Sequence, residues 1–283
     1  MPELPEVEVV RAGLAASLPG RRLASAAVLH PRSVRRHLAG PADFELRLPG
    51  RVFGTPRRRG KFLWLPFEDG DALAGHLGMS GQFRLDEPDA PVLPHTRVVL
   101  RFADDGPELR FVDQRIFGGL WLAPGGADLP ADIGHIAPDL FEPELDLAAL
   151  VRSVRRHRSG IKRVLLDQKV VSGIGNIYAD EALWRAKVHP DTAASSMSPA
   201  RVRRVLEAAR QVMADALGQG GTSFDALYVN VNGSSGYFSR ALAVYGREGL
   251  PCPRCGSPIV REAFANRSSH RCPRCQPRPR RAH

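Results

Sequence analysis

Hydrophobic residues near the start of the chain recur at helical spacing. Successive apolar positions are three or four residues apart, which places them on one face of a helix. These positions are Val7, Val10, Leu14 and Leu18. The dipeptide Pro19-Gly20 then interrupts the pattern, and such residues commonly end helices. The pattern predicts an amphipathic helix over residues 3–18.

The stretch after this helix changes to short apolar or alternating runs, separated by Gly, Pro and Asp. Runs of this kind with turn residues between them are typical of antiparallel strands. The runs are RRLASAAVLH, FELRLPGRVFG, KFLWLPF, ALAGHLG, TRVVLRF, ELRFVD and GGLWLA. They predict an antiparallel β-sandwich, and PGGADLPADIG after them is predicted to be a linker.

From about residue 139 the pattern becomes helical again. The helix candidates are PELDLAALVRSVRRH, IKRVLLDQ, NIYADEALWRA and PARVRRVLEAARQVMADALG. Ser198 and Pro199 suit the N-cap and first position of the last helix. The Gly-rich stretch GQGGTSFDALYVNVNGSSGYF follows, and a loop of this length is usually either functional or disordered.

Charge narrows the choice of partner. The chain has 283 residues and a net charge of +10, and the segment from Arg247 to His283 contributes +7 of it through nine Arg and two Glu. A basic balance favours a polyanion, with nucleic acid ahead of an anionic membrane surface. The terminal PRPRRAH could equally be a solvated tail. No apolar run spans a bilayer and no signal peptide is evident, so we expect a soluble, cytoplasmic protein.

All the cysteines lie in the segment CPRCGSPIVREAFANRSSHRCPRC. They form two CxxC pairs separated by sixteen residues, a spacing typical of zinc sites. Disulfides are the alternative, although they are rare in cytosolic proteins. We expect a β-hairpin zinc finger with one structural Zn²⁺ and no open coordination position. The ligands would be Cys252, Cys255, Cys272 and Cys275.

Several motifs, in order along the whole chain, resemble the Fpg/Nei family of DNA glycosylases, and within it the formamidopyrimidine-DNA glycosylase branch. They are PELPEVE at the start, RRGKFLWL at 58–65, HLGMSG at 76–81, DQRIFG at 113–118, SGIGNIYADEALW at 172–184, SGYF at 235–238 and NRSSHRCPRCQ near the end. The resemblance implies an α+β fold with three parts. They are a helix and antiparallel β-sandwich over 1–130, a helix–two-turn–helix domain over 131–246 and a zinc finger over 247–283.

The first residues have two interpretations. Pro and Glu suit the first turn of a helix, where acids complement the helix dipole. Alternatively, loss of Met1 exposes the secondary amine of Pro2, and an α-amino group has a pKa near 8 rather than about 10.4 for lysine, so more of it is a free nucleophile. The resemblance favours the second interpretation. It implies that Pro2 forms a Schiff base with C1′ of the damaged nucleotide, that Glu3 transfers protons, and that Glu6 lines the site.

The resemblance assigns two further catalytic residues. It implies that Lys61 donates a proton in β-elimination and contacts a phosphate. It also implies that Arg267 in the finger hairpin grips the phosphates of the lesion and assists δ-elimination. Without the resemblance, each would be one solvated cation among many.

Other matches imply contacts with DNA. Met79, Arg115 and Phe117 correspond to side chains that fill the gap left by an extruded base, although Met79 and Phe117 alone would suit a core. A second Arg that the family often has is Ile116 here, which leaves a phosphate contact at that position in doubt. Further residues matched to the DNA backbone are His76, His95, Arg158, Lys162 and Asn176. Asn176 would also cap its helix.

The long loop at about 220–238 resembles a segment that covers an everted oxidised purine, which makes Thr222, Ser223 and Tyr237 candidate lesion contacts. The sequence has PELPE, whereas the pyrimidine-selective branch usually has PEGPE. The resemblance therefore implies a monomeric base-excision repair enzyme for oxidised purines in double-stranded DNA, with lyase activity. The alternatives are a glycosylase for oxidised pyrimidines and a zinc-ribbon DNA-binding protein without catalysis.

Overall fold

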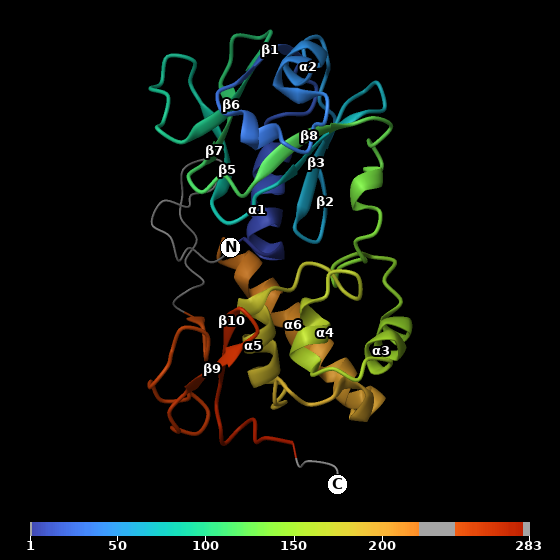
Figure 1. The fold of residues 1–283 in the computed structure, drawn as a ribbon, viewed down its shortest axis with the longest axis vertical. Coiled ribbons are helices and arrows are strands. Elements are labelled where there is room, and N and C mark those ends of the chain that lie inside the picture. Colours follow the sequence, from blue (N-terminus) through green and yellow to red (C-terminus); the bar gives the residue numbers. More distant parts are fainter. Residues whose placement is uncertain (1, 221–240, 280–283) are drawn as a thin grey trace. The chain divides into compact units, whose positions relative to one another are not determined.

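The computed structural model describes residues 2–220 and 241–279 and divides into two compact units (Figure 1). The described residues up to His135 belong to the first unit, and those from Ile136 to Gln219, together with 241–279, belong to the second. Within these residues, the structure contains no helix whose length and apolar character would allow it to cross a membrane.

The first unit begins with helix α1, Leu4–Ala15. Glu3 is its N-cap residue and Pro5 lies in its first turn, where a missing backbone N–H costs nothing. The face formed by Val7, Val10 and Leu14 is buried. The predicted N-terminal helix is confirmed, although it ends three residues earlier than the hydrophobic spacing indicates.

Two four-stranded antiparallel sheets follow, which confirms the predicted fold class. The first sheet has the order β2-β3-β4-β8 and consists of Arg57–Arg59, Phe62–Pro66, Ala72–His76 and Gly119–Ala123. The second has the order β1-β6-β7-β5 and consists of Leu23–Val28, Thr96–Phe102, Glu108–Asp113 and Gly81–Asp86. The chain therefore changes sheet between β1 and β2, between β4 and β5 and again between β7 and β8.

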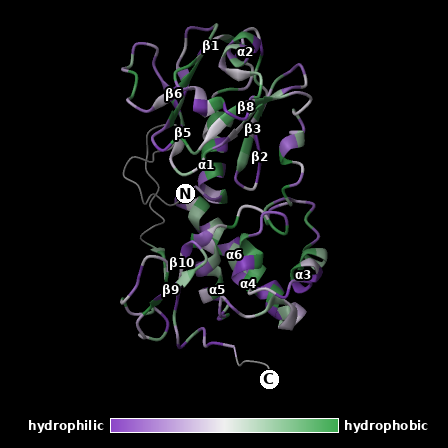
Figure 2. Cartoon of the chain, viewed as in Figure 1, coloured by the Kyte–Doolittle hydropathy of each residue, from purple (hydrophilic) through white to green (hydrophobic). Residues whose placement is uncertain are grey.

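One apolar cluster joins α1 to both sheets. Val10 and Leu14 come from α1, Leu63 from β3, and Leu100 and Phe111 from the other sheet. Their side chains are almost completely excluded from solvent, so burial of this shared core stabilises the first unit as a whole. Figure 2 shows the hydrophobic residues along these strands.

One segment of the predicted β region is helical instead. Helix α2, Gly40–Arg47, includes the residues FELR that we expected in a strand. Pro41 lies at its start, and Phe44 and Leu48 are buried one turn apart on the same side. Helical spacing of two buried residues outweighs strand propensity in a segment this short. A 3₁₀ turn, η1, Pro31–Val34, precedes it.

The second unit contains the predicted helices. They are α3, Leu147–Arg155; α4, Ile161–Leu166; α5, Asn176–Arg185; and α6, Pro199–Gly218. The Oγ of Ser198 accepts the backbone N–H of Arg201 at 3.3 Å, which confirms the predicted N-cap. Helices α3 and α4 carry hydrophobic and hydrophilic residues together (Figure 2). Short 3₁₀ turns occur at η2, Ala131–Ile133, in the first unit and at η3, Ala194–Ser196, in the second.

The second unit ends in an antiparallel hairpin of β9, Val260–Phe264, and β10, Arg267–Arg271. The hairpin belongs to the predicted zinc finger and is confirmed. Its apolar cluster is small and consists of Val244, Cys252, Ile259 and Cys272, with Trp184 packed against it. A two-stranded hairpin is marginally stable by itself, so other interactions must hold this element in place.

Candidate functional site

The first residues of the chain are fixed by helix capping. Glu3 and Glu6 are 2% and 3% exposed. The carboxylate of Glu6 accepts the backbone N–H of Glu3 at 2.8 Å, within a reciprocal capping box. This arrangement holds the backbone immediately after Pro2 in one conformation. Glu6 therefore caps the start of α1, in addition to the expectation from the sequence that it lines the site.

Helix α1 is also tied to strand β2 by charge. Glu8 accepts hydrogen bonds from Arg11 and from Arg58 of β2, and the Arg58 Nε–Glu8 Oε2 distance is 2.9 Å. Burial alone would raise the pKa of Glu8, but the hydrogen bonds from Arg11 and Arg58 outweigh it and lower the pKa. Glu8 is therefore ionised at neutral pH, and its contacts fix α1 against the strand that leads to Lys61.

Lys61 and His76 lie at the adjacent ends of two neighbouring strands of the first sheet. Lys61 precedes β3 and is 9% exposed, while His76 ends β4 and faces Phe62 across the ladder. Burial, followed by the charges of Arg36, Lys61 and Arg35, lowers the pKa of His76 to about 4. Its Nδ1 accepts the backbone N–H of Gly78 at 3.0 Å. The neutral ring therefore carries its proton on Nε2, which is an uncharged hydrogen-bond donor.

The three proposed inserting side chains lie on two loops of the first unit. Met79 and Phe117 are 39% and 46% exposed, which excludes the alternative that they are core residues. Arg115 is exposed too, and its guanidinium carbon lies 5.1 Å from the centre of the Phe117 ring. Ile116 between them has a φ of 55°, so its β-branched side chain sits in a strained backbone conformation.

His95 has a weaker link to this region. It is partly exposed, its Nδ1 lies 3.3 Å from Nη2 of Arg97, and its carbonyl accepts the backbone N–H of Asp113 at 2.9 Å. Arg97 Nε in turn donates to the carbonyl of Asp113 at 2.8 Å. His95 therefore lies beside the base of the loop that carries Arg115.

In the second unit, Asn176 begins α5 but does not cap it. Gly175 is the N-cap residue, because its extended backbone places Asn176 already inside the helix. The Asn176 amide instead donates to the carbonyl of Ser268 in β10 at 2.9 Å. Its Oδ1 is buried, with no hydrogen-bond partner among the residues described. The predicted N-cap role is wrong, and the residue links α5 to the finger hairpin.

The structure places Lys162 in the interior. We expected it on a phosphate-facing surface, but its side chain is completely buried and its Nζ lies 2.7 Å from Oδ1 of Asp180, itself completely buried. The Nζ also donates to the carbonyl of Ser268 at 3.3 Å and lies 4.6 Å from the centre of the Phe264 ring. A buried charge with these partners stays in place, so direct binding to DNA does not fit Lys162 in this conformation.

Two other cations of the second unit are accessible. Arg267 is exposed and opens β10, just after a turn in which Ala265 has a φ of 50°. Arg158 is exposed in the segment between α3 and α4. The structure thus places Arg267 next to Ser268, whose carbonyl is held by both Lys162 and Asn176.

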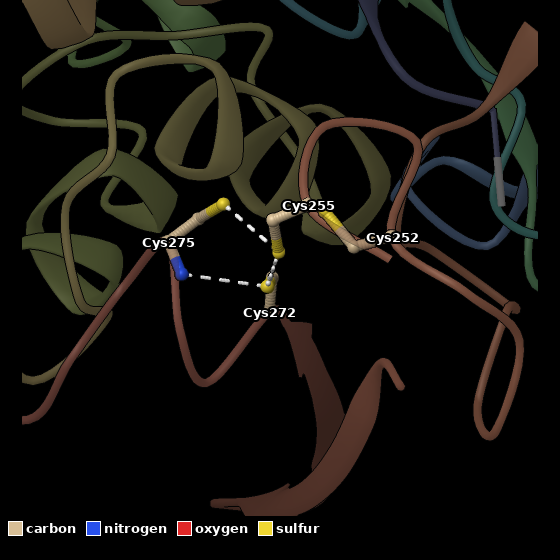
Figure 3. Close-up of side chains that lie close together, drawn as sticks. All are labelled: Cys252, Cys255, Cys272 and Cys275. Atoms are coloured by element: carbon tan, nitrogen blue, oxygen red, sulfur yellow. Dashed lines mark hydrogen bonds between the residues drawn. The ribbon is translucent and has the colours of Figure 1, made fainter. Parts of the chain in front are cut away.

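The four cysteines converge as the spacing predicts (Figure 3). One ligand atom from each lies within 4.8 Å of the others. The Sγ atoms of Cys255 and Cys272 are 3.4 Å apart, well beyond a disulfide bond of about 2.05 Å, and all four are free thiols. Four sulfur donors in this arrangement fit one tetrahedral Zn²⁺.

The thiols of Cys255 and Cys272 have pKa shifts in opposite directions. Hydrogen bonds from Ser257 lower the pKa of Cys255 to about 6, whereas burial raises the pKa of Cys272 to about 12. A thiolate buried in this way needs a cation to stabilise its charge. Trp184 Nε1 also donates to Sγ of Cys252 at 3.3 Å, and such outer partners fix the orientation of a ligand.

Several residues that organise these elements were not predicted. Ser80 and Asp113 connect the two loops of the first unit. Asp180 accepts the Ser269 hydroxyl at 3.0 Å and the His270 backbone N–H at 2.8 Å. Glu181 is 4% exposed and accepts backbone N–H groups of residues 243–245. The two consecutive acids in YADEALW could have indicated Asp180 and Glu181, because acids inside a largely apolar helix are buried only with specific partners.

The predicted lesion contacts Thr222, Ser223 and Tyr237 lie outside the described residues.

Three family models together match almost the whole chain. The formamidopyrimidine-DNA glycosylase N-terminal domain matches residues 1–120, and the H2TH domain of the same glycosylase matches 136–226. The zinc finger found in FPG and IleRS matches 249–278.

Similar proteins carry the same description. A formamidopyrimidine-DNA glycosylase from a Nocardioides species is 62% identical, with 99% of this chain and 96% of that protein covered. Lactococcus lactis Fpg (MutM), solved with DNA containing an oxidised pyrimidine, is 33% identical with a TM-score of 0.88, covering 98% of this chain and 100% of that one. A MutM bound to DNA containing carbocyclic 8-oxo-G is 32% identical with a TM-score of 0.85 and the same coverage.

Proposed function

Because the chain belongs to the formamidopyrimidine-DNA glycosylase family, we propose that it removes oxidised purines from double-stranded DNA and then cuts the strand. The lesions would be 8-oxoguanine and formamidopyrimidines. Support comes from the 62% identity to a named formamidopyrimidine-DNA glycosylase and from the likeness to a MutM solved on 8-oxo-G DNA.

The observation that carries the proposal is the position of Pro2. It directly precedes the capped helix α1, and its neighbour Glu3 is buried in a reciprocal capping box with Glu6. After removal of Met1, the Pro2 nitrogen is a secondary amine with a pKa near 8, so a usable fraction is unprotonated at neutral pH. In this proposal, Pro2 supplies the nucleophile and the neighbouring Glu3 supplies the carboxyl group at the start of α1.

The proposed chemistry has two stages. The Pro2 nitrogen attacks C1′ of the damaged nucleotide, the glycosidic bond breaks, and the base leaves with the bonding electrons and gains a proton. Glu3 transfers protons to the sugar ring oxygen and from the amine. The C1′–O4′ bond of the sugar then breaks, the ring oxygen keeps the proton from Glu3, and C1′ becomes an iminium on the Pro2 nitrogen. The iminium makes the C2′ proton acidic, so loss of this proton expels the 3′ phosphate from C3′ in β-elimination. A second, δ-elimination then releases the 5′ phosphate.

Other residues would position the DNA. Lys61 would donate a proton in β-elimination and contact a phosphate, and His76 and His95 would contact the DNA backbone. Arg267 would grip the phosphates of the lesion and assist δ-elimination. Met79, Arg115 and Phe117 fill the space left by the everted base. Further proposed backbone contacts are Arg158 and Asn176. Zn²⁺ bound by the four cysteines would keep the hairpin that carries Arg267 folded and would take no part in the chemistry.

The remaining expectations complete the proposal. Three domains, over 1–130, 131–246 and 247–283, would act on one DNA duplex, and the loop at about 220–238 would cover the lesion. The protein would act as a monomer in the cytoplasm, associated with the nucleoid. A net charge of +10 supports a polyanionic partner.

Product analysis tests this function. The protein is incubated with a duplex that contains 8-oxoguanine opposite cytosine, and the strand ends are identified. We expect free 8-oxoguanine and a one-nucleotide gap with phosphate at both ends. Pro2→Gly should lower incision strongly, and an extra residue before Pro2 should abolish it, because the nitrogen becomes an amide. Binding without release of the base or incision of an abasic duplex would instead identify a non-catalytic DNA-binding protein.

A preference for oxidised pyrimidines is the second candidate. One observation favours it: the Lactococcus lactis Fpg structure holds DNA with an oxidised pyrimidine. Competition between 8-oxoguanine and thymine-glycol duplexes for the same protein decides the order of preference. Faster cleavage of the thymine-glycol strand would assign the chain to pyrimidine repair.

A further inference from the structure

Two loops of the first unit cross between the sheets side by side. The first insertion loop, residues 77–80, joins β4 to β5 and carries Met79. The second insertion loop, residues 114–118, joins β7 to β8 and carries Arg115 and Phe117. Their ends are paired in both sheets, His76 with Gly119 and Gly81 with Asp113. The loops are therefore adjacent at both ends, although more than thirty residues separate them in sequence.

A buried hydrogen-bond cluster joins the two insertion loops. The Ser80 hydroxyl donates to Oδ1 of Asp113 at 2.5 Å, and Oδ2 of Asp113 accepts the backbone N–H of Gly118 at 2.8 Å. The Ser80 oxygen in turn accepts the backbone N–H of Arg115 at 3.0 Å. Asp113 is completely buried and Ser80 is 7% exposed, so these bonds to a carboxylate face little competition from water.

The backbones of the two loops also touch. Gly78 has a φ of 62°, and a Cβ on it would lie 2.4 Å from the carbonyl carbon of Phe117 and from the nitrogen of Gly118. Arg35 also donates to the carbonyls of Phe117 at 3.0 Å and Gly118 at 2.8 Å. The second loop thus contacts Gly78 closely and is hydrogen-bonded to the Arg35 guanidinium, so it has little room to move alone.

We propose that Ser80 and Asp113 are positioning residues that lock the two insertion loops together, so that Met79, Arg115 and Phe117 enter DNA as one rigid wedge. The inference rests on the proposed function, because that function supplies the duplex the wedge enters. A wedge fixed before binding avoids the entropy of ordering two loops on the DNA. Met79, Arg115 and Phe117 then present different side chains to the DNA, while the backbones of their two loops move together.

A double-mutant cycle tests the coupling. Single-turnover release of 8-oxoguanine opposite cytosine is measured for Met79→Ala, Phe117→Ala and the double variant, in the wild-type and Ser80→Ala backgrounds. In the wild-type background we expect the double loss to fall short of the product of the single losses by on the order of tenfold. In the Ser80→Ala background we expect the losses to multiply. Equal coupling in both backgrounds would overturn the inference.

Two controls separate positioning from loss of fold. Ser33 is a matched buried serine whose Oγ has no hydrogen-bond partner in the described part of the chain, so Ser33→Ala should leave the coupling intact. Ser80→Thr keeps the hydroxyl and should retain the coupling. Ser80→Ala should slow release of 8-oxoguanine by about tenfold but incision of a preformed abasic site by no more than about twofold, since no base must be pushed out there. Equal losses on the two substrates would contradict positioning.

The outcomes also separate this inference from the proposed function. If the wild-type protein releases 8-oxoguanine but shows the same coupling with and without the Ser80 hydroxyl, only the wedge is overturned. If the wild-type protein neither releases 8-oxoguanine nor incises the abasic duplex, the proposed function fails and the wedge fails with it.

Discussion

The two units both place exposed candidate DNA contacts beside a buried carboxylate, but they support them differently. In the first unit Asp113 accepts neutral donors, the Ser80 hydroxyl and the Gly118 backbone N–H, beneath loops mounted on a large shared core. In the second unit Asp180 is paired with the buried Lys162 and holds the hairpin next to Arg267.

The two units differ in the interactions that keep their candidate DNA contacts in place. The insertion loops extend from strands of a sandwich whose apolar core would persist if a single hydrogen bond were lost. The finger hairpin has a small apolar cluster and depends on a metal centre and a buried ion pair. A two-stranded element of this kind is marginal without such support. Single changes should therefore displace Arg267 more readily than they displace Met79 or Phe117.

Metal removal should have the largest effect. Stripping zinc with a strong chelator should unfold the finger, because metal binding supplies its folding free energy, and incision should fall by roughly a hundredfold or more because Arg267 loses its position. The thermal transition of the β-sandwich should remain. Incision and calorimetry before and after chelation measure both, and added Zn²⁺ should restore activity. Undiminished incision by the metal-free protein would show that the hairpin stays folded without its metal and would contradict this prediction.

Breaking the buried ion pair comes next. Lys162→Met leaves the Asp180 carboxylate buried without its cation, so we expect a loss of about 3–5 kcal/mol in the free energy of unfolding of the second unit. Urea titration measures it. The matched control is Lys169→Met, because Lys169 is exposed and should matter little. Equal stability of the two variants would mean that Lys162 does not support the hairpin.

A smaller effect is expected at the corresponding carboxylate of the first unit. Asp113→Asn places an amide NH₂ where one oxygen now accepts, so one of the Ser80 and Gly118 bonds is lost. We expect the free energy of unfolding to fall by about 1–3 kcal/mol, less than for Lys162→Met. The same urea titration provides the comparison. A larger loss for Asp113→Asn would reverse the ranking of the two supports.

The smallest effect should come from an exposed ion pair of the first unit. Arg21 Nη2 lies 2.7 Å from Oδ1 of Asp104, whose side chain is 49% exposed. The hydrogen bond from Arg21 lowers the pKa of Asp104 from 3.8 to about 2. A lowered folded-state pKa stabilises the fold above the unfolded-state pKa, and this contribution is lost as the pH falls from about 4 to about 2.

Asp104→Asn should therefore cost about 0.2–1 kcal/mol at pH 7 and almost nothing near pH 2. Chemical unfolding of the variant and the wild type at both pH values measures the difference. If the cost does not diminish at low pH, the stabilisation does not come from the charge of Asp104.

Much of this arrangement was predictable from local patterns. Helical spacing gave α1 and the four later helices, alternation gave the sandwich, and the paired CxxC motifs gave the finger. Helix α2 was missed because eight residues with few apolar positions give a weak helical signal. The candidate catalytic residues came from resemblance, since Pro and Glu at a helix start are equally ordinary capping residues.

The residues that support the candidate contacts could not be predicted from the sequence, for a physical reason. Lysine usually lies on the surface, and the burial of Lys162 depends on Asp180, which only the packing of α4 against α5 brings near. Ser80 and Asp113 meet because two loops cross between the sheets in register, a consequence of strand pairing over long sequence distances. Local sequence pattern therefore predicts the helices, strands and zinc finger better than it predicts the buried residues that hold them in place.

The chemistry at Pro2 is tested most directly by locating the covalent bond. The protein is reacted with 8-oxoguanine duplex DNA in the presence of borohydride, digested, and examined by peptide mass spectrometry. We expect a reduced sugar adduct on the N-terminal peptide that begins with Pro2 and lacks Met1. An adduct on Lys61 or another lysine, or a peptide that retains Met1 in the trapped complex, would contradict the proposed nucleophile.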